Sequence, residues 1–225
     1  MGILNKQSLA VTVDNINAEQ FFGRKIPITQ RRAAAKWLAS RQGIDGAYSG
    51  LIAPTDRDRR GGFKVFTGEK ITSGAGAGHV LGEEGCRALI TLGVSNKEIR
   101  GALENAWDEF GARLKASTSP KGTFCCASCS VALWRHLAAG GLSEPERQLA
   151  AGLKYLKLHR MEGGRWRRFP FYYTIFALTE IEARGVKAEL KFCAPACERA
   201  LRHMRGTNEY TVRCRTVLER ALERL

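Results

Sequence analysis

A motif that recurs at fixed spacing is the feature of this 225-residue chain that most limits how it can fold. Two full copies, Trp37–Tyr48 and Tyr155–Trp166, begin with an aromatic–Leu pair and carry a long polar side chain four residues after the leucine. Both end in Gly-x-aromatic, with the glycine eight residues after the leucine. A partial copy, Leu114–Phe124, keeps the leucine-to-glycine step and the final aromatic. Self-similarity of this kind is typical of stacked supersecondary units.

Each part of the motif has a physical role in a helical hairpin. An aromatic–Leu pair in the last turns of a helix packs into the hairpin, and a glycine just past the helix allows a left-handed or tight backbone. The second aromatic fills the gap below the next helix. The polar side chain between them can bond backbone groups that are left free at helix ends.

Helix patterns alternate with short Gly, Ser and Pro breaks. The predicted helices run from Pro27 to about Gly43 and then over about 79–92, 96–116, 124–139, 143–160, 170–184, 187–205 and 208–224. The predicted N-caps are Ser95, Ser143 and Asn208, and the predicted stops are Gly93, Gly140, Gly185 and Gly206. No alternation is long enough for a sheet, so we predict an all-α fold of antiparallel helical hairpins.

Residues 1–26 lack a sustained hydrophobic period and are predicted to be an N-terminal arm. We predict a single domain over 27–225, with a long glycine-rich loop at 43–78. Within that loop, Asp56-x-Asp58 is interpreted as a surface loop neutralised by arginines, and Gly74–Gly78 as a hinged flap. No uncharged run reaches the length of about 18 residues that a membrane span needs, and the start lacks a signal-peptide pattern. We therefore expect a cytoplasmic protein.

The charge of the chain favours anionic partners. Lys and Arg outnumber Asp and Glu 36 to 22, which gives a net charge of +14 and favours an anionic small molecule, an acidic protein or nucleic acid. Nucleic acid is the less favoured of these, and a solvated basic surface is the alternative, because no helix-turn-helix, RNA-binding or zinc-finger signature is present. The seven cysteines are an odd number, so we expect thiols, metal ligands or core residues rather than a fully paired disulfide framework.

The segment WLASRQGIDGAY resembles the QW-type repeat of the terpene cyclase and prenyltransferase superfamily, which includes squalene-hopene cyclase and the β subunits of protein prenyltransferases. The resemblance covers about residues 30–210 and implies an α/α toroid, in which helices alternate between an outer and an inner ring. Tyr48 and Phe124 stand where the repeat usually has Trp, and Arg160 stands where it has Gln. Because only about four hairpins can be counted, we expect an open or reduced toroid, or one completed by the N-terminal arm or by a second chain.

The resemblance implies that the starts of the inner helices surround a central cavity, and it places the candidate site there. The candidate catalytic residues are His79, Glu83 and Cys126. The candidate substrate-binding residues are Arg165, Arg167, Arg168, Phe171, Tyr172, Tyr173 and Tyr210. The candidate metal ligands, for zinc, are Cys126, Cys129 and His79.

The sequence Cys125-Cys126-Ala-Ser-Cys129 admits three interpretations. The two-residue spacing between Cys126 and Cys129 occurs in zinc sites, and His79 or the pair Cys193 and Cys197 would complete the set. Protein prenyltransferases instead hold zinc with Asp, Cys and His. Small cysteines also pack where helices approach closely. A helix N-terminus, finally, lowers the pKa of a thiol and favours a reactive cysteine.

The other candidates have alternative interpretations as well. His79 and Glu83 share a helix face and could bind a metal or share a proton, whereas Glu83 and Glu84 could equally be the charge of a solvent-facing helix start. The aromatic run Phe169–Tyr173 could line an apolar pocket, with the arginines of 165–168 holding a diphosphate at its rim, or it could pack the repeat beside a basic surface turn.

Two functions follow from these features. One is an enzyme, or a former enzyme, of the terpene cyclase and prenyltransferase type that binds an apolar or prenyl-type ligand, with or without a diphosphate, in a central cavity. The other is a non-catalytic basic helical scaffold that binds an acidic protein or nucleic acid, as one chain or as a homodimer. A redox module built on the three clustered cysteines is a third interpretation.

Overall fold

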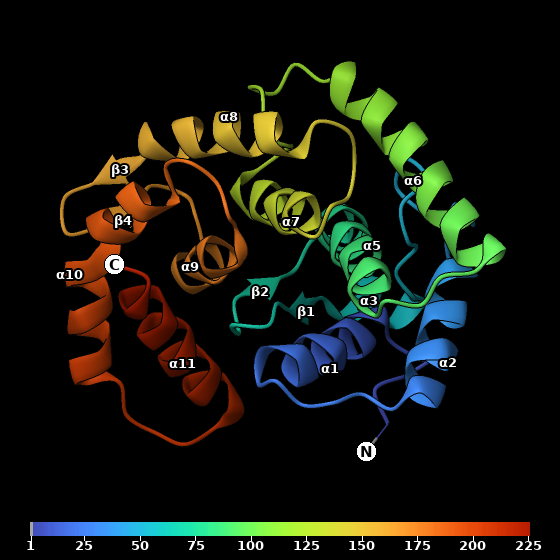
Figure 1. Cartoon of the computed structure of the whole chain (residues 1–225), viewed down its shortest axis with the longest axis horizontal. Coiled ribbons are helices and arrows are strands. Elements are labelled where there is room, and N and C mark those ends of the chain that lie inside the picture. The colour runs from blue at the N-terminus through green and yellow to red at the C-terminus, as the bar shows by residue number, and fades with distance from the viewer. Residues whose placement is uncertain (1) are drawn as a thin grey trace. The chain divides into compact units, whose positions relative to one another are not determined.

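The computed structural model describes residues 2–225 and is mostly helical (Figure 1). Helices account for 61% of the chain and strands for 4%, which confirms the predicted all-α class. The strands are two-residue pairs that close two antiparallel hairpins. These hairpins pair β1 (Phe63–Lys64) with β2 (Lys70–Ile71) and β3 (Arg160–Met161) with β4 (Arg165–Trp166).

Backbone contacts divide the chain into two compact units, whereas the sequence predicts one domain after an arm. Unit 1 comprises Met1–Val65, Lys70–Thr118 and Ala139–Ser143, and unit 2 comprises Phe66–Glu69, Ser119–Ala138 and Glu144–Leu225. Figure 1 colours unit 1 mainly blue to green and unit 2 mainly yellow to red. Each unit buries apolar side chains of its own, among them Leu9, Leu38 and Leu89 in unit 1 and Tyr173, Phe176 and Leu218 in unit 2.

Unit 1 is built around helix α5 (Gly82–Thr91), which is buried from Gly82 to Leu89. It packs against α1 (Leu9–Phe21), α2 (Ile28–Ala39) and α6 (Lys97–Lys115). Two glycines let the chain at Leu51 and Ile52 lie directly on α5. A Cβ atom at Gly82 or Gly85 would sit 2.8 Å from one of these side chains, a separation that packed side chains cannot tolerate.

The segment predicted to be an N-terminal arm forms a packed helix, which corrects the prediction for residues 1–26. Helix α1 buries apolar side chains at helical spacing, namely Leu9, Val13, Ile16 and Phe21. Asn17 Oδ1 on the same face accepts a 2.7 Å hydrogen bond from Arg87 Nη1 of α5. Because buried polar residues such as Thr12 and Asn17 interrupt the apolar pattern, the period of this helix is weak in the sequence.

The glycine-rich stretch predicted as a loop at 43–78 contains regular structure. It holds α3 (Asp56–Gly61), the β1–β2 hairpin and α4 (Gly74–Gly76), and a π-helical turn η1 (Ala77–Leu81) then leads into α5. The segment interpreted as a flap therefore begins the helical run that ends with α5. Ala77 and Gly78 are already buried there.

Asp58 is buried in α3, which corrects the interpretation of Asp56-x-Asp58 as a surface loop. Its carboxylate is 2% exposed and accepts hydrogen bonds from Ser8 Oγ at 2.6 Å and from Leu9 N at 2.8 Å. It also closes a capping box with Thr55. The negative charge of Asp58 is therefore stabilised by hydrogen bonds that the start of α1 donates, rather than by the neighbouring arginines.

Unit 2 is built around α9 (Phe171–Glu180), which is buried along most of its length. Helix α9 packs against α7 (Ala127–Ala138), α10 (Val186–His203) and α11 (Glu209–Glu223), and α8 (Pro145–Lys157) packs against α7 and α10. The guanidinium of Arg135 joins α7 to α9 through a two-pronged ion pair with Glu180, with N–O distances of 2.7 and 3.0 Å.

The segment Phe66–Glu69, which connects β1 to β2, belongs to unit 2. The ring of Phe66 packs on Phe176 of α9 with centroids 4.7 Å apart. The guanidinium carbon of Arg213, from α11, lies 4.6 Å from the centroid of the same ring. This guanidinium also donates a hydrogen bond to the Phe66 carbonyl oxygen. The glycine-rich stretch thus supplies part of the core of unit 2.

The recurring motif has the geometry that its sequence predicts. Its glycines, Gly46, Gly122 and Gly164, all have positive φ, between 74° and 87°. Leu38 and Leu156 lie in the last turns of α2 and α8 and are fully buried. The second aromatic packs at the start of the following helical run, where Tyr48 meets His79 and Trp166 meets Phe171. These observations confirm the roles assigned to the glycine, the leucine and the second aromatic.

The polar position of the motif differs in part from its predicted role. Gln42 Nε2 donates to a loop carbonyl, that of Gly50, at 3.0 Å rather than to a helix end. Arg160 reaches the first turns of α10, where it donates to Ala188 O and to the carboxylate of Glu189. The indole of Trp166 donates to the same carboxylate at 3.0 Å, so Glu189 joins two motif residues to the next helix.

Most helix ends agree with the predicted ranges. Asn208 caps α11 as predicted, but Asn96 rather than Ser95 caps α6, and Glu144 rather than Ser143 precedes α8. Helix α9 ends at Glu180, short of the predicted 184, because Ile181 is extended. Along residues 2–225, no helix is both long enough and apolar enough to cross a bilayer.

Candidate functional site

The structure distributes the predicted site residues over several places. In unit 2, Arg165, Tyr172 and Tyr210 line one pocket, which we call the arginine pocket. Cys126 and Arg168 line a second pocket of the same unit, which we call the thiol pocket. The remaining candidates lie in the core of unit 2, on its surface or in unit 1.

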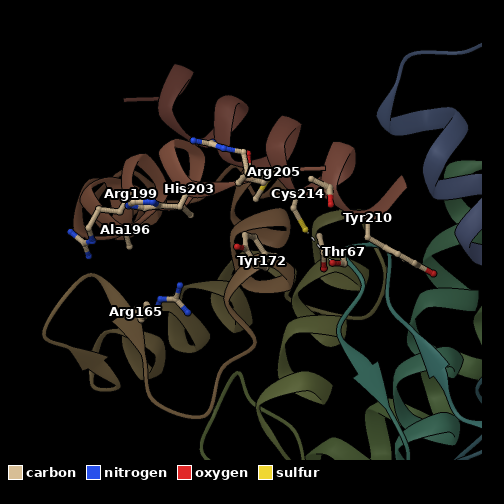
Figure 2. A pocket seen from close by; sticks show the side chains of 12 residues that line it. Thr67, Arg165, Tyr172, Ala196, Arg199, His203, Arg205, Tyr210 and Cys214 are labelled. Carbon is tan, nitrogen blue, oxygen red and sulfur yellow. Dashed lines mark hydrogen bonds between the residues drawn. The ribbon is translucent and has the colours of Figure 1, made fainter. Parts of the chain in front are cut away.

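The arginine pocket is a cavity of about 620 Å³ within unit 2 (Figure 2). Five segments contribute to it: the Phe66–Glu69 segment, β4, α9, α10 with the residues after it, and α11. Its lining residues are Thr67, Arg165, Tyr172, Ala196, Arg199, Ala200, His203, Met204, Arg205, Tyr210, Thr211 and Cys214. This volume is in the range of small-molecule sites, about 300–1,000 Å³.

Three guanidinium groups give this pocket its charge, and each is held by a contact of its own. Arg165 lies over the ring of Phe171, 4.4 Å from the centroid. Arg199 donates to Gly163 O, and Arg205 donates to Arg202 O at 2.8 Å. Since a guanidinium has five N–H donors, each arginine keeps donors for a ligand.

Among the described residues, none of those that line the arginine pocket is an Asp or a Glu. The carboxylate of Glu69 lies close by, and it accepts hydrogen bonds from Tyr173 N at 2.9 Å and from the Thr67 hydroxyl. Burial raises the pKa of the Tyr172 phenol above its ordinary value. Burial also raises the pKa of the Cys214 thiol to about 12, and its sulfur donates to Thr67 O at 3.2 Å.

The thiol pocket is smaller, about 290 Å³, and lies at the start of α7. Its walls include the rings of Phe124, Tyr155 and Phe169, together with hydroxyl groups, and its reactive and charged side chains are Cys125, Cys126, His159 and Arg168. His159 Nδ1 lies 2.9 Å from Tyr155 O, which fixes the orientation of the imidazole ring.

The two thiols of the Cys126-x-x-Cys129 sequence are in contact and differ in burial. Their sulfurs lie 3.4 Å apart, and Cys129 is 1% exposed whereas Cys126 is exposed. The hydrogen bond from Cys129 and the first backbone amides of α7 lower the pKa of Cys126 to about 6, and the same contact together with burial raises the pKa of Cys129. The predicted effect of a helix N-terminus on Cys126 therefore has the expected direction.

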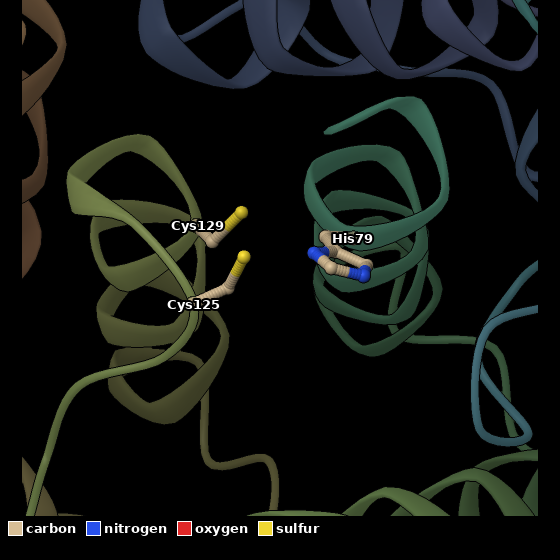
Figure 3. A group of neighbouring side chains, drawn as sticks. All are labelled: His79, Cys125 and Cys129. Carbon is tan, nitrogen blue, oxygen red and sulfur yellow. The ribbon is translucent and has the colours of Figure 1, made fainter. Parts of the chain in front are cut away.

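The predicted zinc ligands come from both units. Figure 3 draws Cys125 and Cys129 at the start of α7, with their side chains leaving the same side of the chain, and also draws His79, which belongs to unit 1. Within unit 2, all of whose residues are described, no three His, Cys, Asp or Glu side chains bring their ligand atoms together. Cys193 and Cys197 instead contact each other inside α10, with sulfurs 3.8 Å apart. A zinc site at Cys126 and Cys129 stays a prediction.

The candidates in unit 1 are buried. His79 lies in the π-helical turn with its ring 4.0 Å from that of Tyr48, and burial, with the charge of Arg113, lowers its pKa. Glu83 is 0% exposed and Glu84 is 3% exposed, which corrects their interpretation as a solvent-facing helix start. The catalytic roles of His79 and Glu83 stay predictions.

Two predicted substrate-binding residues lie in the core of unit 2 and line neither pocket. Tyr173 is fully buried, and its ring lies beneath Arg135. Phe171 is 8% exposed and packs between Trp166 and Arg165. Arg167 is exposed and lines neither of the two pockets.

Comparison with protein-family models, with curated proteins and with solved structures finds no significant match for this chain.

Sequence reasoning missed several residues of the arginine pocket. Arg199 and His203 lie one helical turn apart on α10, so their spacing could have shown that they share a face. Thr67 carries no such signal, because only the packing of the Phe66–Glu69 segment in unit 2 brings it to the pocket.

Proposed function

We propose that this protein binds an amphipathic small molecule with an anionic head, of the prenyl diphosphate class, in the arginine pocket of unit 2. The observation that carries the proposal is the lining of that pocket, in which three arginines and a histidine stand beside an apolar wall. Guanidinium groups match the geometry and charge of a phosphate.

The polar part of the pocket would hold the head group. Arg165, Arg199 and Arg205 come from different segments, so a single anion between them would join β4, α10 and the turn that follows α10. His203 adds a further donor. No Asp or Glu stands among the described lining residues, and the nearby carboxylate of Glu69 already accepts hydrogen bonds from Tyr173 N and the Thr67 hydroxyl, so positive groups outnumber negative ones around an anion bound there.

The apolar part of the pocket would hold a hydrocarbon tail. Ala196, Ala200 and Met204 form one wall along α10 and its end, and the rings of Tyr172 and Tyr210 face the same cavity. Methionine adapts to irregular apolar ligands, and aromatic faces provide apolar area with a polar edge. A ligand with both a charged end and an apolar end uses both parts of this lining.

We also propose that the helical hairpins are those of a reduced α/α toroid of the terpene cyclase and prenyltransferase type. Two features support this arrangement. The motif glycines all have positive φ. Helices that are buried nearly throughout, α5, α7 and α9, alternate along the chain with helices that have an exposed face, α6, α8 and α10. Inner and outer helices of a toroid would differ in this way.

Calorimetric titration with farnesyl diphosphate, farnesol and inorganic diphosphate tests the proposal. We expect farnesyl diphosphate to bind best, because it alone uses both the arginines and the apolar wall. Arg199→Gln should weaken that binding by about 10-fold or more, since a hydrogen bond to a charged group contributes about 1.5–3 kcal/mol.

Arg202→Gln is the matched control, because Arg202 is an exposed arginine of the same helix that does not line the pocket. Equal affinity in the two variants, with steep salt dependence and no preference for a tail, would contradict the proposal. That result would favour the alternative, a basic scaffold with a net charge of +14 that binds acidic protein or nucleic acid.

A further inference from the structure

We propose that Cys126 and Cys129 form a thiol–disulfide exchange site, in which Cys126 attacks a small carboxylate-bearing disulfide and Cys129 resolves the mixed disulfide. The site is independent of the proposed ligand binding, because the thiol pocket and the arginine pocket share no lining residue.

The first observation is the asymmetry of the two cysteines. Cys126 is exposed and lines a cavity, whereas Cys129 is 1% exposed behind it. An incoming disulfide can therefore reach Cys126 but not Cys129. With the two sulfurs 3.4 Å apart, Cys129 is already in contact with the atom that it would attack in the second step.

The second observation is the position of the pair at the start of α7, a helix of 12 residues. Cys126 immediately precedes Ala127, the first residue of this helix, and the free backbone N–H groups at a helix start stabilise negative charge close to them. Two intervening residues at a helix start place both sulfurs on the same side of α7, where they are already in contact at 3.4 Å.

The third observation is the cavity in front of Cys126, which indicates the kind of substrate. The cavity of about 290 Å³ has aromatic walls and carries Arg168 and His159 on its surface. Arg168 supplies a cation for a carboxylate. Cys125, Ser128 and Ser130 provide further polar groups along the walls. This lining fits a substrate disulfide in which one sulfur belongs to a short peptide with a carboxylate.

The exchange balances in two displacements. The Cys126 thiolate attacks one sulfur of R–S–S–R′, forms the bond between Cys126 and R–S, and releases R′–S⁻, which takes a proton from water. Cys129 loses its proton to solvent, attacks the Cys126 sulfur, forms the Cys126–Cys129 disulfide and releases R–S⁻. The protein dithiol is oxidised, the substrate disulfide is reduced to two thiols, and an external dithiol returns the protein to its starting state.

The reduced full-length protein, treated with oxidised glutathione and mapped by mass spectrometry, tests the proposal. We expect a Cys126–Cys129 disulfide in the wild type, with two glutathione molecules released for each protein. Cys129→Ala should stop the reaction at a glutathionyl group on Cys126. Cystamine, a cationic disulfide, should react more slowly than oxidised glutathione, and Arg168→Gln should reduce this difference.

Cys125→Ser tests which exposed thiol takes part in the exchange, because Cys125 lines the same pocket next to Cys126. The Cys125→Ser variant should still end with the Cys126–Cys129 disulfide, whereas Cys126→Ser should not form it, and circular dichroism should show that both variants are folded. Modification of Cys125 in preference to Cys126, or no disulfide in the wild type, would overturn the proposal. Stoichiometric zinc that is held by the purified protein and lost in Cys126→Ser would overturn it as well, in favour of a metal site.

Discussion

Asp58 illustrates how far a single residue can depart from the interpretation of its sequence neighbourhood. Arginines surround it in the sequence, yet its carboxylate accepts hydrogen bonds from Ser8, Leu9 and Thr55 in a site that is 2% exposed. The partners at Ser8 and Leu9 lie about 50 positions away in the chain. No local pattern could have identified them, because only the packing of α1 against α3 brings them together.

We predict that Asp58→Asn will lower the free energy of unfolding by about 3 kcal/mol, because an amide nitrogen replaces an acceptor oxygen in a buried network. Thermal and urea unfolding would measure the loss. Asp56→Asn, at an exposed position of the same helix, should change stability by no more than about 0.5 kcal/mol. Equal effects of the two substitutions would contradict the role of Asp58.

Cys214 gives a second prediction at this scale. Because only the thiolate reacts with iodoacetamide and burial raises the pKa of Cys214 to about 12, this residue should be almost unmodified at pH 8 although it lines the arginine pocket. Its reactivity should rise only as the pH approaches 12. Peptide mapping would compare it with exposed Cys125, and equal labelling of the two at pH 8 in the folded protein would count against the prediction.

At the scale of elements, the motif glycines determine how one helix passes to the next. Gly122 has φ +74°, and a Cβ atom there would lie 2.3 Å from both Gln148 O and Gly152 N of α8. Its carbonyl also accepts the indole N–H of Trp134 at 2.7 Å. A side chain at this position would be strained by the backbone conformation and by the contact with α8 together.

We predict that Gly122→Ala will destabilise the protein by more than about 2 kcal/mol. Gly101→Ala should have the opposite sign and add up to about 1 kcal/mol, because Gly101 lies inside α6 and a Cβ atom there would meet nothing within 4 Å. Chemical denaturation of the two variants and of the wild type would measure both changes in the free energy of unfolding. A neutral Gly122→Ala would contradict the role assigned to the repeat.

At the scale of the whole molecule, the chain connects its two units more than once. Unit 1 receives residues from three stretches of sequence, and so does unit 2. The segment Phe66–Glu69 belongs to unit 2 although the strands on either side of it, β1 and β2, belong to unit 1. A prediction of domains from sequence order alone cannot find such a division.

We predict that Phe66→Ala will lower the free energy of unfolding of unit 2 by about 3–4 kcal/mol, because it removes a buried ring from between Phe176 and Arg213. Amide hydrogen exchange should become faster in α9 and α11. Phe63→Ala, a buried phenylalanine of unit 1, is the control and should accelerate exchange in unit 1 instead. Unchanged exchange in α9 after Phe66→Ala would contradict the assignment of this segment.

The sequence alone determined the helical class, most helix ranges and the backbone conformation of the motif glycines. These features depend on local physics: apolar spacing, capping and the freedom of glycine act over a few residues. The same local effects identified Cys126 as a thiol at a helix start, whereas the resemblance to the terpene cyclase and prenyltransferase repeat placed Arg165, Tyr172 and Tyr210 among the ligand-binding candidates.

Tertiary structure alone decided which of these residues share a cavity. Arg165 and Arg168 are three positions apart in the sequence but line different pockets, while Thr67 joins Arg199 and Cys214 from more than 130 positions away. Tertiary structure also places Tyr173 and Glu83 in the buried core, although both were predicted to be site residues. Whether a residue is buried, and which cavity it lines, depends on contacts between segments that are far apart in the chain. A local sequence pattern contains no information about those contacts.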